Sequence, residues 1–164
     1  MNFLEKMSEI YNKNKNLKIF LDMDGTVVEC LFDLDESFAK EGGYVVKKPI
    51  KPVLEQINKM KSFFSGVEIN ILSCSRNHLM TKEKNEWLDK NIPYIKNENR
   101  IFLDKENEEY ANEDRNKVKG NYIKNNILDD EIAILIDDDI KVLREAQEIL
   151  KEKVVPIHVT SLLI

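Results

Sequence analysis

The chain has 164 residues, of which 42% are hydrophobic and 34% charged, and this length suits one domain with a buried core. The apolar content is too high for a disordered chain, and no stretch reaches the roughly 18 apolar residues that a membrane span needs. Lys and Arg number 25 against 30 Asp and Glu, a formal net charge of −5. We therefore expect no membrane partner and no stable nucleic-acid partner.

The cysteines, Cys30 and Cys74, do not have the C-x-x-C spacing of a structural zinc site. Residues 1–10 alternate charged and apolar side chains, which is not the pattern of a secretory signal. Nothing in the sequence points to an oxidising compartment, so a reduced cytoplasmic protein is expected.

The first half of the chain alternates helical and strand patterns. In order, the predicted elements are an amphipathic helix at 3–13, an apolar strand at 17–21 that ends at Asp22, an insertion without clear period at about 28–48, a helix at 50–64, and a strand at 67–72 that ends at Ser73.

The second half continues this alternation. Its predicted elements are a helix at about 80–91 closed by Pro93, a short strand at 101–103, a polar loop at 104–116, a helix at about 118–127, an apolar strand at 132–136, a helix at 140–151, and a last strand at 154–159. Pro156 in the last strand indicates a sheet edge, because proline cannot donate to a neighbouring strand.

The predicted strands lack an alternating polar face, which indicates burial on both sides. Alternation of such strands with helices is typical of an open parallel α/β sheet, Rossmann-like, with helices on both faces. We expect residues 1–164 to form one domain, with residues 28–48 as a small cap after the first strand.

Acidic side chains follow two of the predicted strands, and ligands of such sheets bind at the carboxyl ends of the strands. Asp22, Asp24 and Asp137 would bring three carboxylates to one crevice, and their repulsion would raise at least one pKa. A divalent cation removes that cost, and several carboxylate ligands suit Mg²⁺ better than zinc.

A carboxylate cluster around Mg²⁺ at a strand–loop–helix junction is typical of a phosphate site. Ser73 can donate a hydrogen bond from the second strand end, and Lys119 or Lys117 can supply a cation.

These motifs together resemble the haloacid dehalogenase-like phosphohydrolases over essentially the whole chain. Asp22-Met23-Asp24-Gly25-Thr26 resembles motif I of that family, Ser73 motif II, Lys119 motif III, and Asp137-Asp138 the acidic motif IV. The order of the motifs along the chain is also that of the family.

A narrower resemblance is to the 5′(3′)-deoxyribonucleotidase-like branch. It rests on the segments Glu41–Tyr44, Lys84–Lys90, Lys119–Ile123 and Leu135–Asp138. The spacing favours Lys119 over Lys117. The chain departs from that branch in the Cys-Ser-Arg-Asn that follows Ser73, and it lacks a glycine-rich stretch after the final helix.

The resemblance implies a role for each motif residue. Asp22 would attack phosphorus to form an aspartyl-phosphate, and Asp24 would protonate the leaving alcohol and then activate water. The carboxylates of Asp22 and Asp137 and the backbone carbonyl of Asp24 would hold Mg²⁺, with Asp138 helping through water. Ser73 and Lys119 would bind the phosphoryl oxygens.

The implied activity is that of a Mg²⁺-dependent phosphomonoesterase that acts on a small phosphorylated substrate, with (deoxy)nucleoside monophosphates the expected class. The alternatives are a phosphatase of another phosphometabolite, of a phosphoprotein or of a nucleic-acid end, a phosphotransferase, and a non-catalytic module that binds phosphate or Mg²⁺.

Several of these residues also have structural interpretations. Asp22–Thr26 could form a simple turn, and Asp139 could serve only as a helix N-cap. Arg76 and His78 are expected on the surface, and Cys74 and Trp87 in the packing. The predicted cap contains three aromatic residues, Phe32, Phe38 and Tyr44. The sequence is equally compatible with these side chains lining a pocket and with their only stabilising the cap.

Overall fold

A computed structural model describes residues 1–30 and 40–164. Its centre is a five-stranded, all-parallel sheet in the order β3-β2-β1-β4-β5. The strands are β1 (Leu17–Leu21), β2 (Glu68–Ser75), β3 (Arg100–Asp104), β4 (Ile132–Asp137) and β5 (Val154–His158). The helices are α1 (Phe3–Lys13), α3 (Lys51–Phe63), α4 (His78–Asn91), α5 (Val118–Asn126) and α6 (Ile140–Leu150), with short 3-10 turns at Asn97–Asn99, Lys151–Lys153 and Val159–Leu163.

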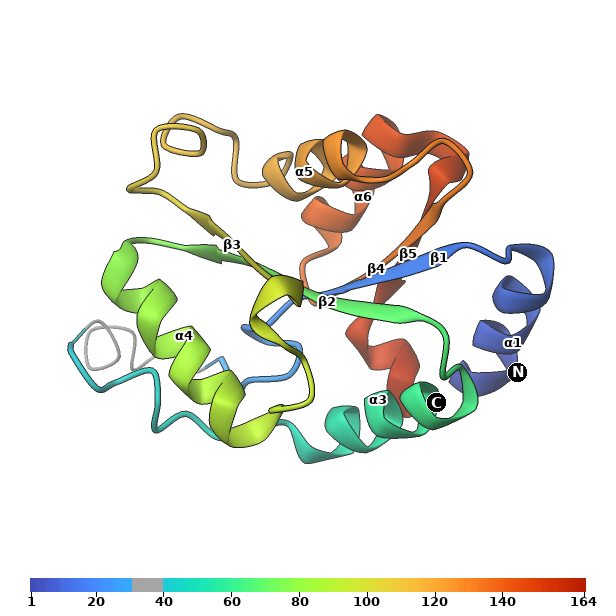
Figure 1. The fold of residues 1–164 in the computed structure, drawn as a ribbon, viewed down its shortest axis with the longest axis horizontal. Coiled ribbons are helices and arrows are strands. Elements are labelled where there is room, and N and C mark those ends of the chain that lie inside the picture. Colours follow the sequence, from blue (N-terminus) through green and yellow to red (C-terminus); the bar gives the residue numbers. More distant parts are fainter. Residues whose placement is uncertain (31–39) are drawn as a thin grey trace.

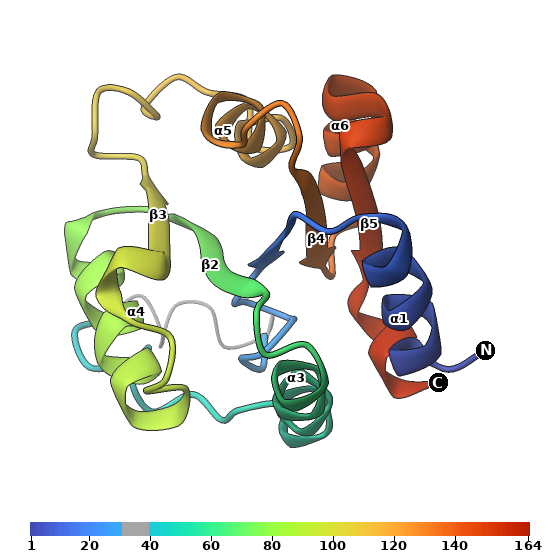
Figure 2. The ribbon, with the colours of Figure 1, turned by 45° about the vertical axis from the view of Figure 1, so that its right-hand side comes forward.

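The helices cover both faces of the sheet (Figures 1 and 2), with α5 and α6 on one side and α1, α3 and α4 on the other. Alternate residues of β1 therefore enter different cores. Ile19 and Leu21 pack in the larger core with Trp87 of α4, and Phe20 packs in the smaller core with Val142 of α6. The predicted Rossmann-like α/β fold, buried on both faces, is confirmed.

Most predicted elements are confirmed to within two residues at each end. Pro156 lies on β5, which is an edge strand as predicted. The prediction that β2 ends at Ser73 is wrong, because the strand continues to Ser75 and pairs with β3 as far as Asp104. A buried hydroxyl can remain inside a strand when it has a hydrogen-bond partner, and Ser73 has one in Lys84.

The predicted cap at 28–48 lies partly outside the described residues, which exclude 31–39 and with them Phe32 and Phe38. Val28 forms isolated bridges to Asp24 and Pro49, so the two ends of this segment lie close together beside the carboxyl end of β1. The cap and the single-domain organisation stay predictions.

Within the described part of the chain, no helix combines the length and the apolar character needed to cross a membrane.

Candidate active site

The sharp turn after β1 places Asp22 and Asp24 at the carboxyl edge of the sheet. The backbone N–H of Asp22 donates to the carbonyl of Ile136, so Asp22 continues the pairing of β1 with β4. Gly25 then adopts φ +77°, a conformation that glycine reaches without steric cost. The N–H groups of Thr26, Val27 and Val28 all point to the carbonyl of Met23, which closes the turn.

The end of β4 brings Asp137 and Asp138 next to this turn. Carboxylate oxygens of Asp22, Asp137 and Asp138 lie within 4.8 Å of one another. The backbone N–H of Asp139 donates to Asp137 Oδ1 at 2.9 Å, and the carbonyl of Asp138 lies 2.9 Å from Nε2 of His158 on β5. These contacts fix the orientation of the acidic loop, while Asp139 also caps α6 through Lys141 N–H.

Lys119 of α5 lies between two of these carboxylates. Its Nζ donates to Asp22 Oδ1 and to Asp137 Oδ2, each at 2.6 Å, and all three side chains are buried. Thr26 Oγ1 donates to the other Asp22 oxygen at 3.2 Å. One lysine faces three carboxylates here, so negative charge is left over.

The pKa values follow from this arrangement. Burial, with the charges of Asp137 and Asp24, raises the pKa of Asp22 to about 6, even though Lys119 lowers it. Burial and the charge of Asp22 also raise the pKa of Asp138. Burial alone would lower the pKa of Lys119, but Asp22 and Asp137 raise it, so the lysine stays charged. The predicted rise of a carboxyl pKa is present, although burial is a larger cause of it than repulsion.

Asp24 lies in a different, cationic environment. Lys84 Nζ donates to Asp24 Oδ2 at 2.8 Å, Tyr44 Oη donates to Asp24 Oδ1 at 2.9 Å, and Lys47 Nζ lies 3.5 Å from the same oxygen. Burial would raise the pKa of Asp24, but the charge and hydrogen bond of Lys84, helped by Lys47 and Tyr44, lower it on balance. Asp24 is therefore ionised at neutral pH.

Lys84 also connects Asp24 to Ser73. Its fully buried Nζ donates to Ser73 Oγ at 2.8 Å and to the carbonyl of Cys74 at 2.6 Å. A hydroxyl that accepts from a lysine keeps its own O–H for another acceptor, so Ser73 can still donate to a ligand.

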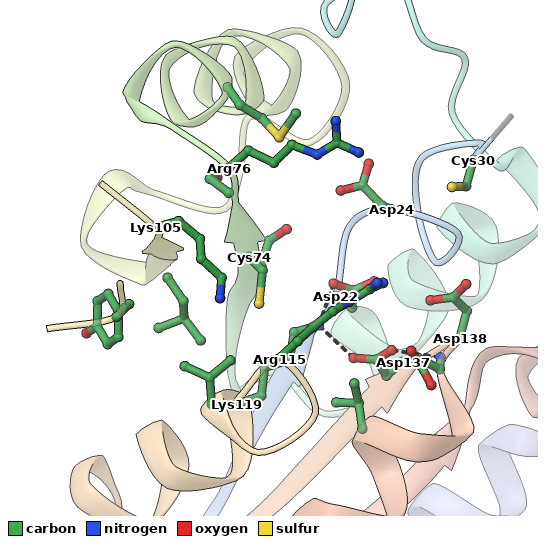
Figure 3. A pocket seen from close by; sticks show the side chains of 18 of the residues that line it. Asp22, Asp24, Cys30, Cys74, Arg76, Lys105, Arg115, Lys119, Asp137 and Asp138 are labelled. Carbon is green, nitrogen blue, oxygen red and sulfur yellow. Dashed lines mark hydrogen bonds and ion pairs between the residues drawn. The ribbon is translucent and has the colours of Figure 1, made fainter. Parts of the chain in front are cut away.

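A cavity of about 480 Å³ lies at the carboxyl edge of the sheet (Figure 3). Lys84 lies behind its wall, in contact with the lining residues Asp24 and Ser73. The sequence-predicted residues Asp22, Asp24, Ser73, Lys119, Asp137 and Asp138 all line the cavity. The volume is within the range of small-molecule sites, roughly 300–1,000 Å³. The cavity can hold a cation at its acidic end, next to a buried carboxylate and a fixed lysine.

Of the residues with competing interpretations, some lie at this site and others do not. Lys117 is exposed, whereas Lys119 reaches the carboxylates. Arg76 is exposed as expected, yet it lines the cavity. His78 is 65% exposed and contacts Asp104 instead. Trp87 is buried in the core as expected.

The structure also shows where Cys74 and Tyr44 lie relative to the cavity. Cys74 lines the cavity, and burial raises the pKa of its thiol, so it lacks the features of an activated nucleophile. Tyr44 is buried, and its hydroxyl contacts Asp24, so this residue lines the pocket.

Lys84 is the main residue that the sequence did not assign to the site. A signal for it exists in α4, where Lys84 lies one turn before the buried pair Trp87 and Leu88 and thus on the apolar face of the helix. A lysine on such a face needs buried partners. Lys105 and Arg115 of the polar segment 104–116 line the cavity itself, and no sequence pattern in that segment predicts this position.

No protein-family model matches the chain, and no curated protein matches it. Among solved structures, a chain in the Pnkp1/Rnl/Hen1 RNA repair complex is similar, with a TM-score of 0.61 and 17% identity. The match covers 87% of this chain and 42% of that chain, so the present chain spans less than half of the length of its neighbour. At this identity the likeness concerns the fold.

Proposed function

We propose that the protein is a Mg²⁺-dependent phosphomonoesterase that works through an aspartyl-phosphate on Asp22. The observation that carries this proposal is the convergence of Asp22, Asp137 and Asp138 around buried Lys119 at the wall of a cavity. An acidic cluster with too few cations, beside a carboxylate that can attack, suits phosphoryl transfer.

The residues present fit a hard divalent cation. Asp22, Asp137 and Asp138 supply oxygen ligands, and the raised pKa of Asp22 reflects a charge that a cation would stabilise. When bound, Mg²⁺ would neutralise part of the charge on the phosphoryl oxygens and so allow an anionic nucleophile to approach.

The chain's own residues carry the bond changes. An Asp22 carboxylate oxygen attacks phosphorus, the bond from phosphorus to the ester oxygen breaks, and the leaving alcohol takes a proton from Asp24. Water then attacks the aspartyl-phosphate while Asp24 removes a proton from it, which releases phosphate and restores Asp22. Lys119 and Ser73 bind the transferring oxygens.

Asp24 must be protonated before it can act as the acid. In the free protein, Lys84 and Lys47 keep its pKa low. A phosphate group that enters the cavity brings negative charge close to Asp24 and engages the nearby cations, and both effects raise the pKa of Asp24. Substrate binding thus prepares the acid.

We infer that the substrate is a nucleoside monophosphate. The cavity is of a size for a small molecule, and its wall includes apolar side chains on which a base can pack, namely Met80, Leu103, Tyr110, Val118 and Val142.

The test is phosphate release from a panel of phosphorylated nucleosides and sugars with Mg²⁺, with EDTA as the metal-free control. Asp22→Asn should lower kcat by about 10³-fold or more, because the amide is a poor nucleophile. Asp129→Asn removes the same charge at an exposed site and should leave kcat within about twofold. Turnover by Asp22→Asn at the wild-type rate would exclude Asp22 as the nucleophile.

A second candidate is a phosphatase that acts on a nucleic-acid end. It is favoured by the similar fold found in the RNA repair complex. Phosphorylated oligonucleotides in the same panel separate it from a nucleotidase.

A further inference from the structure

Tyr44 contacts Asp24, the residue that the proposed reaction uses first as an acid and then as a base. Tyr44 is 1% exposed and lines the cavity, and its hydroxyl donates to Asp24 Oδ1 at 2.9 Å. On the opposite oxygen, Lys84 Nζ donates to Asp24 Oδ2 at 2.8 Å. The carboxylate of Asp24 is therefore held at both oxygens, by donors from two different parts of the chain.

These hydrogen bonds are needed to give the Asp24 carboxylate one orientation. The terminal torsion of an aspartate side chain has a broad, roughly twofold preference, so the rotamer alone does not fix where the two oxygens point. The Asp24 side chain is also 33% exposed, so packing does not enclose it. A general acid must lie about 2.6–3.2 Å from the atom that receives its proton. The donors on its two oxygens thus decide whether Asp24 can reach a leaving group.

The segment that carries Tyr44 is attached to the core of the fold. The carbonyl of Tyr44 accepts from Lys47 N–H at 3.1 Å, and the carbonyl of Lys47 accepts from Trp87 Nε1 of α4 at 2.9 Å. Trp87 is fully buried in the larger core. Residues 40–49 accordingly lie next to α4 in both ribbon views (Figures 1 and 2). The position of the Tyr44 hydroxyl is therefore set by contacts with a packed helix.

The ring of Tyr44 also contacts the cations that bind Asp24. Lys47 Nζ lies 4.6 Å and Lys84 Nζ 5.3 Å from the ring centroid, both within the roughly 6 Å of a cation–π contact. A phenylalanine at this position would keep the ring and these contacts and would lose only the hydrogen bond to Asp24. The contribution of the hydroxyl can therefore be separated from that of the ring.

We propose that Tyr44 is a positioning residue whose hydroxyl holds the carboxyl group of Asp24 toward the oxygen of the leaving alcohol. This inference rests on the proposed function and adds to it a residue that acts through the acid and not on the phosphoryl group. It predicts a dependence on the leaving group. An alkoxide leaves phosphorus only as it receives a proton, whereas para-nitrophenolate is stable enough to leave without one. A merely structural role of Tyr44 would slow both kinds of substrate alike.

The experiment compares kcat/KM of the wild type and of Tyr44→Phe for two monoesters in Mg²⁺. One is para-nitrophenyl phosphate, and the other is the alkyl phosphate of the panel that the wild type hydrolyses fastest. Tyr44→Phe should lower kcat/KM for the alkyl ester by about tenfold and should leave that for para-nitrophenyl phosphate within about twofold. Because kcat/KM covers the reaction only as far as the aspartyl-phosphate, the later role of Asp24 as a base does not enter the comparison.

Tyr94→Phe is the matched control. Among the described residues, the hydroxyl of Tyr94 is buried without a hydrogen-bond partner, so its removal breaks no contact and both kcat/KM values should stay within about twofold of the wild type. The proposal is overturned if the ratio of the two kcat/KM values changes by less than about threefold in Tyr44→Phe, whether both substrates slow equally or neither slows.

Failure of the proposed function gives a different result. If the wild type hydrolyses neither ester, the phosphatase assignment fails, and crystal structures of the wild type and Tyr44→Phe then decide on the contact. An Asp24 carboxylate that turns away in the variant supports the positioning role, and an unchanged carboxylate refutes it. If the wild type hydrolyses the aryl ester and no alkyl ester, Asp24 does not act as an acid, and the proposal falls while Asp22 stays the proposed nucleophile.

Discussion

Within the described residues, two clusters of side chains that could bind a metal ion lie at the carboxyl edge of this sheet, and they differ in how their negative charge is balanced. Asp22, Asp137 and Asp138 form one, and His78, Asp104 and Glu106 form the other, each with ligand atoms within 4.8 Å of one another. By composition alone, the second cluster, which contains a histidine, is as good a metal site as the first.

The contacts of Asp104 separate the two clusters. Its Oδ2 accepts from Thr81 Oγ1 at 2.7 Å and lies 2.9 Å from His78 Nδ1, and its Oδ1 accepts from Glu106 N–H at 2.9 Å. Burial would raise the pKa of Asp104, but these hydrogen bonds lower it on balance. In the first cluster the pKa of Asp22 is raised to about 6. Ligand atoms lie close together in both clusters. The first cluster differs in that it lines the cavity and has three carboxylates but one lysine in contact with them.

The largest expected effect concerns cation binding. Asp137→Asn should weaken Mg²⁺ binding by about 100-fold, because the ion loses a carboxylate and the excess charge that attracts it. Glu106→Gln makes the same chemical change in the second cluster and should alter Mg²⁺ affinity less than about twofold. Calorimetric titration of both variants measures this, and equal losses in both would remove the distinction between the clusters.

Lys84 gives the second largest effect, on stability. Lys84→Met leaves the Asp24 carboxylate, Ser73 Oγ and the Cys74 carbonyl without their shared donor, which should cost about 1–3 kcal/mol of unfolding free energy. Lys82→Met on the same helix removes a lysine that is 70% exposed and should cost less than about 0.5 kcal/mol. Urea unfolding in EDTA measures both.

The pH dependence of this effect has a definite sign. Lys84 lowers the folded-state pKa of Asp24 below its ordinary value of 3.8, so the stabilisation is present above that value and is lost as pH falls through the folded-state pKa. The stability difference between wild type and Lys84→Met should therefore shrink on acidification below about pH 4. A difference that grew with acid would show that Lys84 does not act through Asp24.

Gly25→Ala should have a smaller effect, and Gly42→Ala is its matched control. A Cβ at Gly25 would collide with the Asp138 carboxylate, whereas a Cβ at Gly42 would meet nothing within 4 Å, although both residues have positive φ. Because alanine is strained at positive φ, each Gly→Ala change should lower the free energy of unfolding by about 1–2 kcal/mol. Gly25→Ala should also weaken Mg²⁺ binding, by about tenfold, because Asp138 is displaced. If both variants bind Mg²⁺ as wild type does, Asp138 has no part in the site.

The contrast between the clusters also shows what the sequence could predict. Parallel strands bring their carboxyl ends to one edge, so Asp22 and Asp137 could be placed together from the strand pattern alone. Lys119 is predicted from the resemblance to the motif order of the haloacid dehalogenase-like phosphohydrolases. Ser73 is predicted both as a strand-end residue and from the resemblance to motif II. The first of these grounds is wrong, because the strand continues to Ser75.

The remaining site residues depend on packing that no short-range pattern encodes. Lys84 reaches Asp24 because α4 packs its apolar face on the sheet, and the helix orientation decides where Nζ ends. Lys105 and Arg115 lie in a segment without periodicity, so only the folded loop shows that they line the cavity. Asp104 at the end of β3 likewise accepts a hydrogen bond from Thr81 of α4, and this contact depends on how the helix packs on the sheet.

The smallest expected effect tests whether the second cluster is purely structural. The hydrogen bond to Asp104 raises the pKa of His78 above its ordinary 6.5, although the imidazole is exposed. Its stabilisation is therefore complete below that value and is lost as pH rises through the folded-state pKa. The urea midpoint of the wild type should exceed that of His78→Gln at about pH 6, and this excess should shrink as pH rises through the folded-state pKa. Added Mg²⁺ should leave the excess unchanged, because Asp104 already has its donors; an increase would make the second cluster a cation site and erase the contrast with the first.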